Sequence, residues 1–309
     1  MLTCDHPVPP DRYNERVEEH LRSTGFYHVT QIGVVQCQKA LVNALVERWH
    51  PDTHTLHLPV GECAVTLEDV AMIFGLPTDG LPVTGMTLSS FEALEAECTI
   101  LFGDKSGASV HWKFLPLLSD FASIGQYSWG SACLAHLYRS LCRASRFDCK
   151  EIDGPLTLLL CWAWMRLPYL VPVPREPRNF SLANRWRNWK RRDRVYRYLK
   201  LAHFRKALDD LQESQFLWVA YSVDRVDPDI ISAEIYMHSV IWSATVPLWT
   251  NRYNHVLTEE PMAPQQPLDT YMYWYRSKYG DHLNLSDLVV QEDVEGDQVM
   301  DDVNEEQEP

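Results

Sequence analysis

The sequence predicts a mainly α-helical, compact domain with one small β-hairpin near residues 53–67. Most segments place their apolar residues at helical spacing, whereas only one pair of short runs alternates around a Pro/Gly turn. The strand–helix alternation that builds a parallel sheet does not occur. With 309 residues, of which 46% are hydrophobic and 23% charged, the chain has an ordinary globular balance and can bury a full-sized core.

The first elements are expected within and just after a polar N-terminal arm. A short helix is predicted over 11–21. A second helix is predicted over 36–49, where apolar residues recur every three or four positions before Pro51 ends the pattern. The predicted hairpin then joins 53–58 to 63–67.

The next helix carries clear signals at both ends. Thr66 can cap a helix over 67–74, and Glu68 and Asp69 suit its first turn because the N-terminal end of a helix attracts negative charge. Gly75 is a usual residue at the end of a helix.

The remaining elements are predicted mainly from apolar spacing. Residues 155–167 are apolar on nearly every side, which is typical of a fully buried helix. Residues 168–184 form a Pro-rich connector, 216–222 is predicted to be a strand, and 230–242 a helix or a strand. Further helices are expected at 89–102, 111–124, 130–147, 195–212 and 271–280.

We expect one domain over residues 31–285, flanked by an N-terminal arm (1–30) and an acidic tail (286–309). The tail contains ten acids and neither Lys nor Arg, so we expect it to be disordered. A membrane partner is not expected, because prolines and Arg166 interrupt the most apolar stretch. The eight cysteines include no C-x-x-C pair, which favours thiols in a reducing compartment, the cytosol or the nucleus.

Charge is distributed unevenly along the chain. The formal net charge of −14 argues at first against a nucleic-acid partner, because phosphates attract positive protein. The tail alone contributes −10, however, and the other 285 residues carry 28 positive and 32 negative charges. Within them, residues 175–206 hold twelve Arg/Lys and two acids, a local net charge of +10.

This basic segment also contains aromatic residues, and it is the candidate site. If 185–206 were helical, Arg187, Arg191, Arg194, Tyr198 and Arg205 would share one face, while Trp186, Trp189, Tyr196, Leu199 and Ala207 would be buried on the other. Such a helix could contact the phosphates of DNA or RNA while docked on the core. The predicted nucleic-acid-binding residues are Arg185, Arg187, Lys190, Arg191, Arg192, Arg194, Arg197 and Lys200. The alternatives are a solvated basic loop, a nuclear-import signal at 190–194, or a patch that binds an acidic protein.

Other kinds of site receive less support. His50, His54, His57 and Cys63 have zinc-like residue types, but a strand over 53–58 would point His54 and His57 to opposite faces, so core or surface histidines are favoured. A helix-turn-helix would need a second helix at 77–86, which is too rich in Pro and Gly. The residues show neither a nucleophile elbow nor a pyridoxal phosphate lysine, and no cofactor is expected. Acidic residues are numerous enough for a transposase-like carboxylate trio, but no spacing selects one.

Several blocks of the sequence resemble the plant mobile domain family, also labelled aminotransferase-like plant mobile domain. The longest is LVNALVERWHPDTHTLHLPVGECAVTLEDVAMIFGLPTDGLPVTG (41–85), and others lie at 137–174, 204–222 and 271–279. The resemblance covers roughly residues 35–280. Residues 250–269 depart from the family pattern, and the metallophosphatase signature of some family members does not occur.

The resemblance implies a transposon-derived nuclear protein, and the lack of a catalytic motif in the residues favours a non-enzymatic one. Family members are associated with transposon silencing, gene regulation and meristem maintenance, so nucleic-acid or chromatin contact is the first functional hypothesis. Some members carry a fused serine/threonine phosphatase domain. The second hypothesis is therefore a protein-interaction scaffold that binds an acidic nuclear partner such as a phosphatase.

Overall fold

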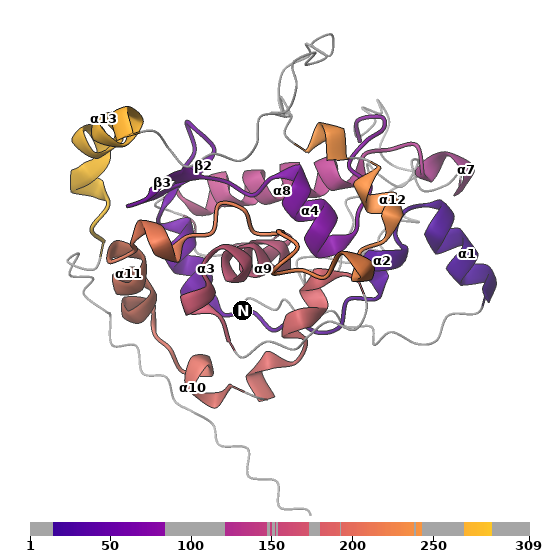
Figure 1. Cartoon of the computed structure of the whole chain (residues 1–309), viewed down its shortest axis with the longest axis horizontal. Coiled ribbons are helices and arrows are strands. Elements are labelled where there is room, and N and C mark those ends of the chain that lie inside the picture. The colour runs from indigo at the N-terminus through magenta and orange to yellow at the C-terminus, as the bar shows by residue number, and fades with distance from the viewer. Residues whose placement is uncertain are drawn as a thin grey trace, which may run out of the picture.

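One buried helix, α9 (Leu156–Arg166), lies at the centre of the molecule, with α3 and α4 packed against it and α8 packed on α4 (Figure 1). The arrangement is mainly helical, as predicted, and is seen in a computed structural model of the chain. The structure describes residues 15–83, 121–146, 149, 152, 154–172, 180–191, 193–237, 239–242 and 269–285.

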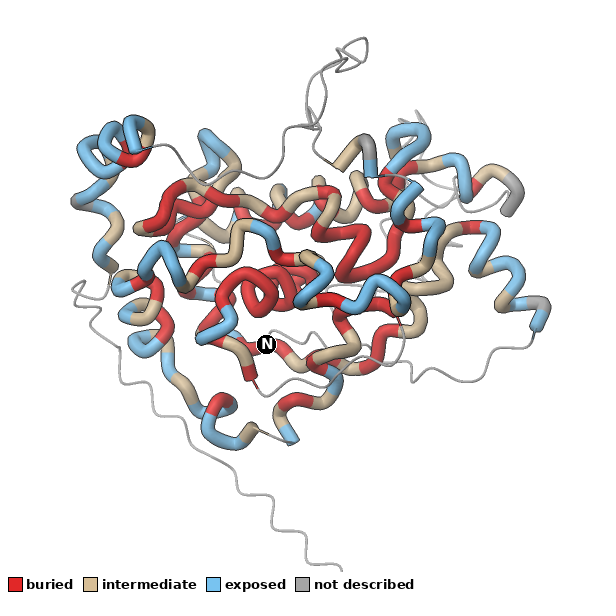
Figure 2. The backbone as a smooth tube through the Cα atoms, in the orientation of Figure 1, coloured by how far each residue is buried: buried red, intermediate tan, exposed pale blue. Residues whose placement is uncertain are grey.

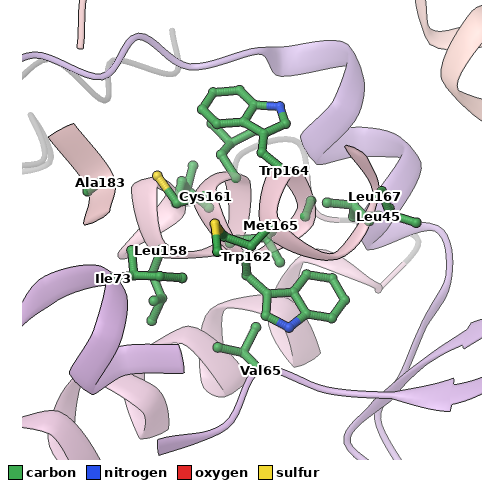
Figure 3. Close-up of a cluster of buried hydrophobic side chains, with 14 of the residues drawn as sticks. Leu45, Val65, Ile73, Leu158, Cys161, Trp162, Trp164, Met165, Leu167 and Ala183 are labelled. Atoms are coloured by element: carbon green, nitrogen blue, oxygen red, sulfur yellow. The ribbon is translucent and has the colours of Figure 1, made fainter. Parts of the chain in front are cut away.

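Burial of α9 on all sides confirms the prediction for 155–167. Trp162 and Trp164 extend in opposite directions from the helix and are both at most 1% exposed (Figure 3). The tube in Figure 2 is buried along nearly all of α9, where only Thr157 is half-buried, whereas α13 is largely exposed. A helix without a polar face can be stable only inside a core, so α9 is the element on which the others pack.

The N-terminal part of the fold forms three helices and a small sheet. The helix predicted over 11–21 is seen as α1, and the predicted hairpin is confirmed, with a third strand added before it. The sheet is antiparallel in the order β1-β2-β3, with Leu56 of β2 opposite both Trp49 and Cys63. The elements are α1 (Glu15–Ser23), α2 (Tyr27–Thr30), α3 (Lys39–Val46), β1 (Trp49–His50), β2 (Thr55–Leu58) and β3 (Gly61–Cys63).

Helix α4 (Leu67–Phe74) begins and ends where the sequence predicts. The Thr66 hydroxyl accepts from the Asp69 backbone N–H, and the Asp69 carboxylate accepts from the Thr66 backbone N–H, which is a complete capping box. Gly75 ends the helix at φ +70°, and a Cβ there would lie 2.5 Å from the Cβ of His28. The helix buries Val70, Ile73 and Phe74, which confirms it as a packing helix.

The strand predicted over 216–222 is wrong. This segment forms turns, because its backbone is bonded to the end of α9 rather than to a strand. The Leu217 N–H donates to the Arg166 carbonyl at 2.9 Å, and the Arg166 guanidinium donates to the carbonyls of Leu217 and Trp218. A strand needs a neighbouring strand to bond to its backbone. Here the backbone groups of Leu217 and Trp218 bond instead to Arg166 at the C-terminal end of α9.

The later helices are largely as predicted. The predicted helices 130–147 and 271–280 are seen as α8 and α13, and the described residues of 230–242 contain two short helical elements, α12 and η7. Helix 89–102, most of 111–124 and the tail 286–309 lie outside the described residues. The remaining elements are α7 (Phe121–Ile124), α8 (Trp129–Ala144), η2 (Pro168–Leu170), η5 (Glu213–Gln215), η6 (Pro228–Ile230), α12 (Ala233–Tyr236), η7 (Ser239–Ile241), α13 (Asp269–Tyr279) and η8 (Gly280–His282).

Two further observations concern the described residues only. None of their helices combines the length and the apolar character needed to cross a bilayer. Their six cysteines are thiols, and burial raises the pKa of Cys63 and of Cys133 to about 12, so neither is a reactive thiolate near neutral pH.

Candidate functional site

The basic segment forms four short helical pieces, so the single amphipathic helix predicted over 185–206 is wrong. The chain turns at Asn188, which has a left-handed φ of +57°, and a new helix starts where the Asp193 carboxylate accepts from the Tyr196 backbone N–H at 2.8 Å. Lys200 is extended and separates the last two pieces. The pieces are η3 (Leu182–Trp186), η4 (Trp189–Arg191), α10 (Arg194–Arg197) and α11 (Leu201–Asp209).

The aromatic residues of the segment nevertheless attach it to the core as predicted. Trp186, Trp189 and Tyr196 are 2%, 1% and 6% exposed. Their rings surround Trp164 of α9, with centroid distances of 5.3, 6.2 and 6.4 Å. The Trp164 indole N–H donates to the Tyr196 hydroxyl at 2.8 Å. Because each turn of the segment buries one aromatic ring, the polar side chains between them are left at the surface.

Hydrogen bonds to the extended chain before α3 hold the segment in place. The Trp189 indole N–H donates to the Gln36 carbonyl at 2.7 Å, and the Gln38 side chain donates to the Tyr196 carbonyl at 2.8 Å. The Asn188 backbone N–H donates to the Val34 carbonyl at 2.9 Å. The turn at Asn188 and the two pieces that follow it, η4 and α10, are therefore fixed by contacts with residues distant in the sequence.

This scaffold brings four basic side chains together around an open hollow of about 390 Å³. Among the described residues, none of the four forms an ion pair with a carboxylate. The nearest acid in sequence, Asp193, caps α10. We call this surface the basic cradle; it is lined by Lys190, Arg191, Arg194, Arg197 and Tyr198.

The other predicted site residues lie elsewhere. Arg185 is half-buried and donates to the Met165 sulfur and the Arg225 carbonyl. Arg187 is exposed, and its side chain lies over Gly33, where a Cβ would come within 2.3 Å of it. Lys200 is exposed but does not line the hollow, and Arg192 lies outside the described residues.

Two residues of the predicted basic face also need correction. Arg205 is bound by the carboxylate of Glu47, with N–O distances of 2.8 and 2.6 Å, so it belongs to the contact between α11 and α3. Tyr198 was expected on the face but not among the binding residues, yet it lines the cradle and is 72% exposed. The sequence signal that could have identified Tyr198 is an aromatic residue that lies within a run of basic residues and is not needed to fill the core.

The histidines considered for zinc form a packed cluster instead. His50 and His57 stack with ring centroids 3.6 Å apart, and His57 Nε2 lies 3.0 Å from a Glu62 carboxylate oxygen. Burial, with His50 as a second cause, lowers the pKa of His57 to about 4. His54 precedes β2 and stacks on Tyr138. In the part of the chain that the structure describes, no group of three or more His, Cys, Asp or Glu side chains could hold a metal ion.

Comparison with known proteins gives a family and several relatives. The family model of the plant mobile domain matches residues 25–100 and 94–255. Protein MAIN-LIKE 1 of Arabidopsis thaliana is 30% identical to this chain over 69% of the chain and 52% of its own length. Protein MAINTENANCE OF MERISTEMS, from the same plant, is 30% identical over 66% of this chain and 52% of its length.

A third relative from Arabidopsis thaliana is the Serine/threonine-protein phosphatase 7 long form homolog. It is 30% identical over 89% of this chain but only 29% of its own length. The chain therefore spans between 29% and 52% of the length of these three relatives. No solved structure matches it significantly.

Proposed function

The chain belongs to the plant mobile domain family, and from this premise we propose that it is a nuclear, non-enzymatic module that contacts nucleic acid through the basic cradle. Its role would lie in gene regulation, transposon silencing or meristem maintenance. The name of one relative, Protein MAINTENANCE OF MERISTEMS, supports the last of these.

The observation that carries the proposal is the set of four cations around the hollow, none of which has an ion-pair partner in the described part of the chain. Like charges in close proximity repel one another, and a surface that gathers them without a carboxylate favours an anionic ligand. Arginine forks match phosphate oxygens, and a bound phosphate releases counterions from the nucleic acid. Since ten of the acids lie in residues 286–309, the net charge of the chain does not describe this surface.

The experiment is a binding measurement across a salt series. Fluorescence anisotropy of labelled duplex and single-stranded oligonucleotides between about 50 and 200 mM salt should show affinity falling steeply with salt. In Arg194→Glu/Arg197→Glu, binding should weaken at least about tenfold, and the log–log salt slope should flatten by about 2, because two phosphate contacts are lost.

A matched control keeps the net charge change the same. Arg146 follows α8 and Arg276 lies on α13, both are exposed, and neither lines the cradle. Arg146→Glu/Arg276→Glu should therefore retain wild-type binding and slope. Absence of salt-dependent binding by the wild type, or equal losses in both double variants, would overturn the proposal.

The non-enzymatic part of the proposal is supported by the chemistry of the described residues. Cys63, Cys133 and Cys161 are buried, or packed against the core, and burial raises their pKa values, which makes poor nucleophiles of them. The His57 ring is 3% exposed and packs against Tyr275 and Tyr279 of α13, so it is poorly placed to meet a substrate.

A second candidate function is a protein-interaction scaffold that binds an acidic partner, for example a serine/threonine phosphatase. The observation in its favour is the relative with a phosphatase name, of which this chain matches 29%. Affinity purification from plant nuclei, with and without nuclease, separates the two candidates. Partners that resist nuclease but are lost in Arg194→Glu/Arg197→Glu would favour the scaffold; partners lost on nuclease treatment would favour nucleic acid.

A further inference from the structure

We infer that the basic cradle takes a single-stranded polynucleotide, with a base stacked on Tyr198 and adjacent phosphates held by the arginines. This inference rests on the proposed function and names its ligand class. It draws on three features: the limited extent of the basic cradle, the shape of the surface, and the exposure of one aromatic ring.

In the part of the basic segment that the structure describes, the cations at both ends of the segment are held by other groups. On one side, Arg185 turns inward to Met165 and to the Arg225 carbonyl. On the other side, Arg205 is held by Glu47, and Lys206 pairs with Asp210 at 3.0 Å. The cradle therefore offers cations to a few neighbouring phosphates, rather than a long track for the two backbones of a duplex.

The shape of the surface also disfavours duplex recognition. A protein that reads a duplex usually inserts a helix or a β-ribbon into a groove about 12 Å wide. Here α10 is only four residues long, and the cations line a concave hollow rather than a projecting ridge. A hollow of about 390 Å³ suits a nucleotide that leaves the strand and enters it.

Tyr198 provides the aromatic surface that single-strand binding needs. It is 72% exposed, whereas Trp186, Trp189 and Tyr196 are buried around Trp164. The Arg197 guanidinium lies 5.4 Å from the centre of its ring, so a cation and a stacking surface occupy one place. Bases stack on such rings without sequence preference, and cations beside them hold the phosphates.

The position of Tyr198 is fixed by its backbone. Its N–H donates to the Val195 carbonyl at 3.1 Å, and it follows α10, whose Tyr196 is anchored in the core. An aromatic ring with two side-chain torsions on a fixed backbone loses little conformational entropy when a base stacks on it. A base can therefore stack on the exposed ring with only a small loss of conformational entropy in the protein.

The test compares ligands and variants under one condition. Labelled oligo-dT, oligo-rU and a blunt duplex of equal length are titrated with wild type, Tyr198→Ala, Tyr198→Phe and the control Tyr273→Ala. Tyr273 is an equally exposed tyrosine, 80%, on α13, which lies far from α10 in Figure 1. Circular dichroism and thermal melting check that each variant is folded.

We expect at least one of the two single strands to bind more tightly than the duplex. Tyr198→Ala should weaken single-strand binding about 5- to 150-fold, the range for loss of one stacked base, with an unchanged salt slope. Tyr198→Phe, which keeps an aromatic ring for stacking, should bind more tightly than Tyr198→Ala, and the control Tyr273→Ala should bind as wild type does. A preference for oligo-dT or oligo-rU identifies the sugar within the same ligand class.

Failure of the inference can be told apart from failure of the proposed function. If duplex binds as tightly as both single strands, or if Tyr198→Ala binds unchanged while Arg194→Glu/Arg197→Glu loses binding, the single-strand inference is wrong and nucleic-acid contact stands. If no oligonucleotide binds the wild type in a salt-dependent manner, both are wrong.

Discussion

Arginine has opposite roles in two regions of this molecule. In the core, Arg166 and Arg48 are 7% and 2% exposed, and each is paired with a buried carboxylate, Asp69 and Asp209. In the basic cradle, Arg191, Arg194 and Arg197 are exposed and have no carboxylate partner among the described residues. Paired and buried charge holds elements of the fold together, whereas gathered and unpaired charge is available to a ligand.

The core network shows how completely a buried charge is satisfied. Asp69 accepts from the Thr66 N–H at 2.7 Å, the Thr66 hydroxyl at 2.8 Å, the Tyr221 hydroxyl at 2.7 Å and the Arg166 guanidinium at 3.0 Å. These bonds connect α4, α9 and the turns after η5. The comparison can therefore be tested by removing a charged side chain from the core network and, separately, from the basic cradle.

The largest expected effect is that of Asp69→Ala. It leaves the Arg166 charge buried without its partner, so the free energy of unfolding should fall by about 3–5 kcal/mol, measured by urea denaturation. The exposed Asp229→Ala is the control and should change stability by less than about 0.5 kcal/mol. In Asp69→Ala/Arg166→Met, part of the loss should be recovered, because no unpaired charge remains. A loss below about 1 kcal/mol in the single variant would contradict this role for the network.

The next effect concerns buried histidine and depends on pH. The pKa of His57 is lowered to about 4, because burial and the neighbouring His50 disfavour the charged ring. An unfolded histidine takes up its proton near pH 6.5, so the unfolded state binds more protons between pH 6.5 and 4. Stability is therefore complete above about pH 6.5 and falls as the pH drops toward 4, by up to about 3 kcal/mol.

The His57→Phe variant isolates this contribution. Urea denaturation of wild type and variant at pH 7.5, 6, 5 and 4.5 should show a smaller loss of stability in the variant over this range. Glu62, Tyr275 and Tyr279 contact the same ring and are unchanged in both proteins. Parallel curves for the two proteins would show that His57 does not take part in the pH dependence.

A smaller effect is expected at the turn that separates η3 from η4. Asn188 has a φ of +57°, a conformation that costs most side chains about 1–2 kcal/mol and that Asn and Gly adopt more readily. Asn188→Ala should therefore lower the free energy of unfolding by about 1 kcal/mol, and Asn188→Gly by less. The Ala variant should also bind oligonucleotide more weakly, because the turn positions Lys190 and Arg191. Equal stabilities of the Ala and Gly variants would argue against strain at this turn.

The sequence predicts best those parts of the fold whose signals are local. The ends of α4 follow from Thr66 and Gly75, and burial of α9 follows from a segment without a polar face. The strand predicted over 216–222 fails because its backbone is bonded to Arg166, some fifty residues earlier in the chain. An apolar run indicates that a segment is buried. Whether it forms a strand or a turn depends on the group that bonds to its backbone, and that group lies elsewhere in the sequence.

The candidate site was predicted in composition but not in geometry. The buried rings of Trp186, Trp189 and Tyr196 follow the expected pattern, whereas the continuous helix does not. Its breaks depend on Asn188, bonded to Val34, and on long-range burial of each aromatic ring. Charge counting also could not show that Arg205 is bound to Glu47 and so is withdrawn from the site.

The smallest expected effect on stability is that of the cradle arginines, which are compared with the buried Arg166. In Arg194→Glu/Arg197→Glu, the free energy of unfolding should change by no more than about 0.5 kcal/mol, because exposed side chains without an ion-pair partner add little to stability. Urea denaturation and oligonucleotide titration of the same preparation measure both properties. A loss of stability above about 1 kcal/mol would mean that cradle arginines hold the fold as Arg166 does. Loss of binding at unchanged stability would mean that the cradle keeps its charge for a ligand.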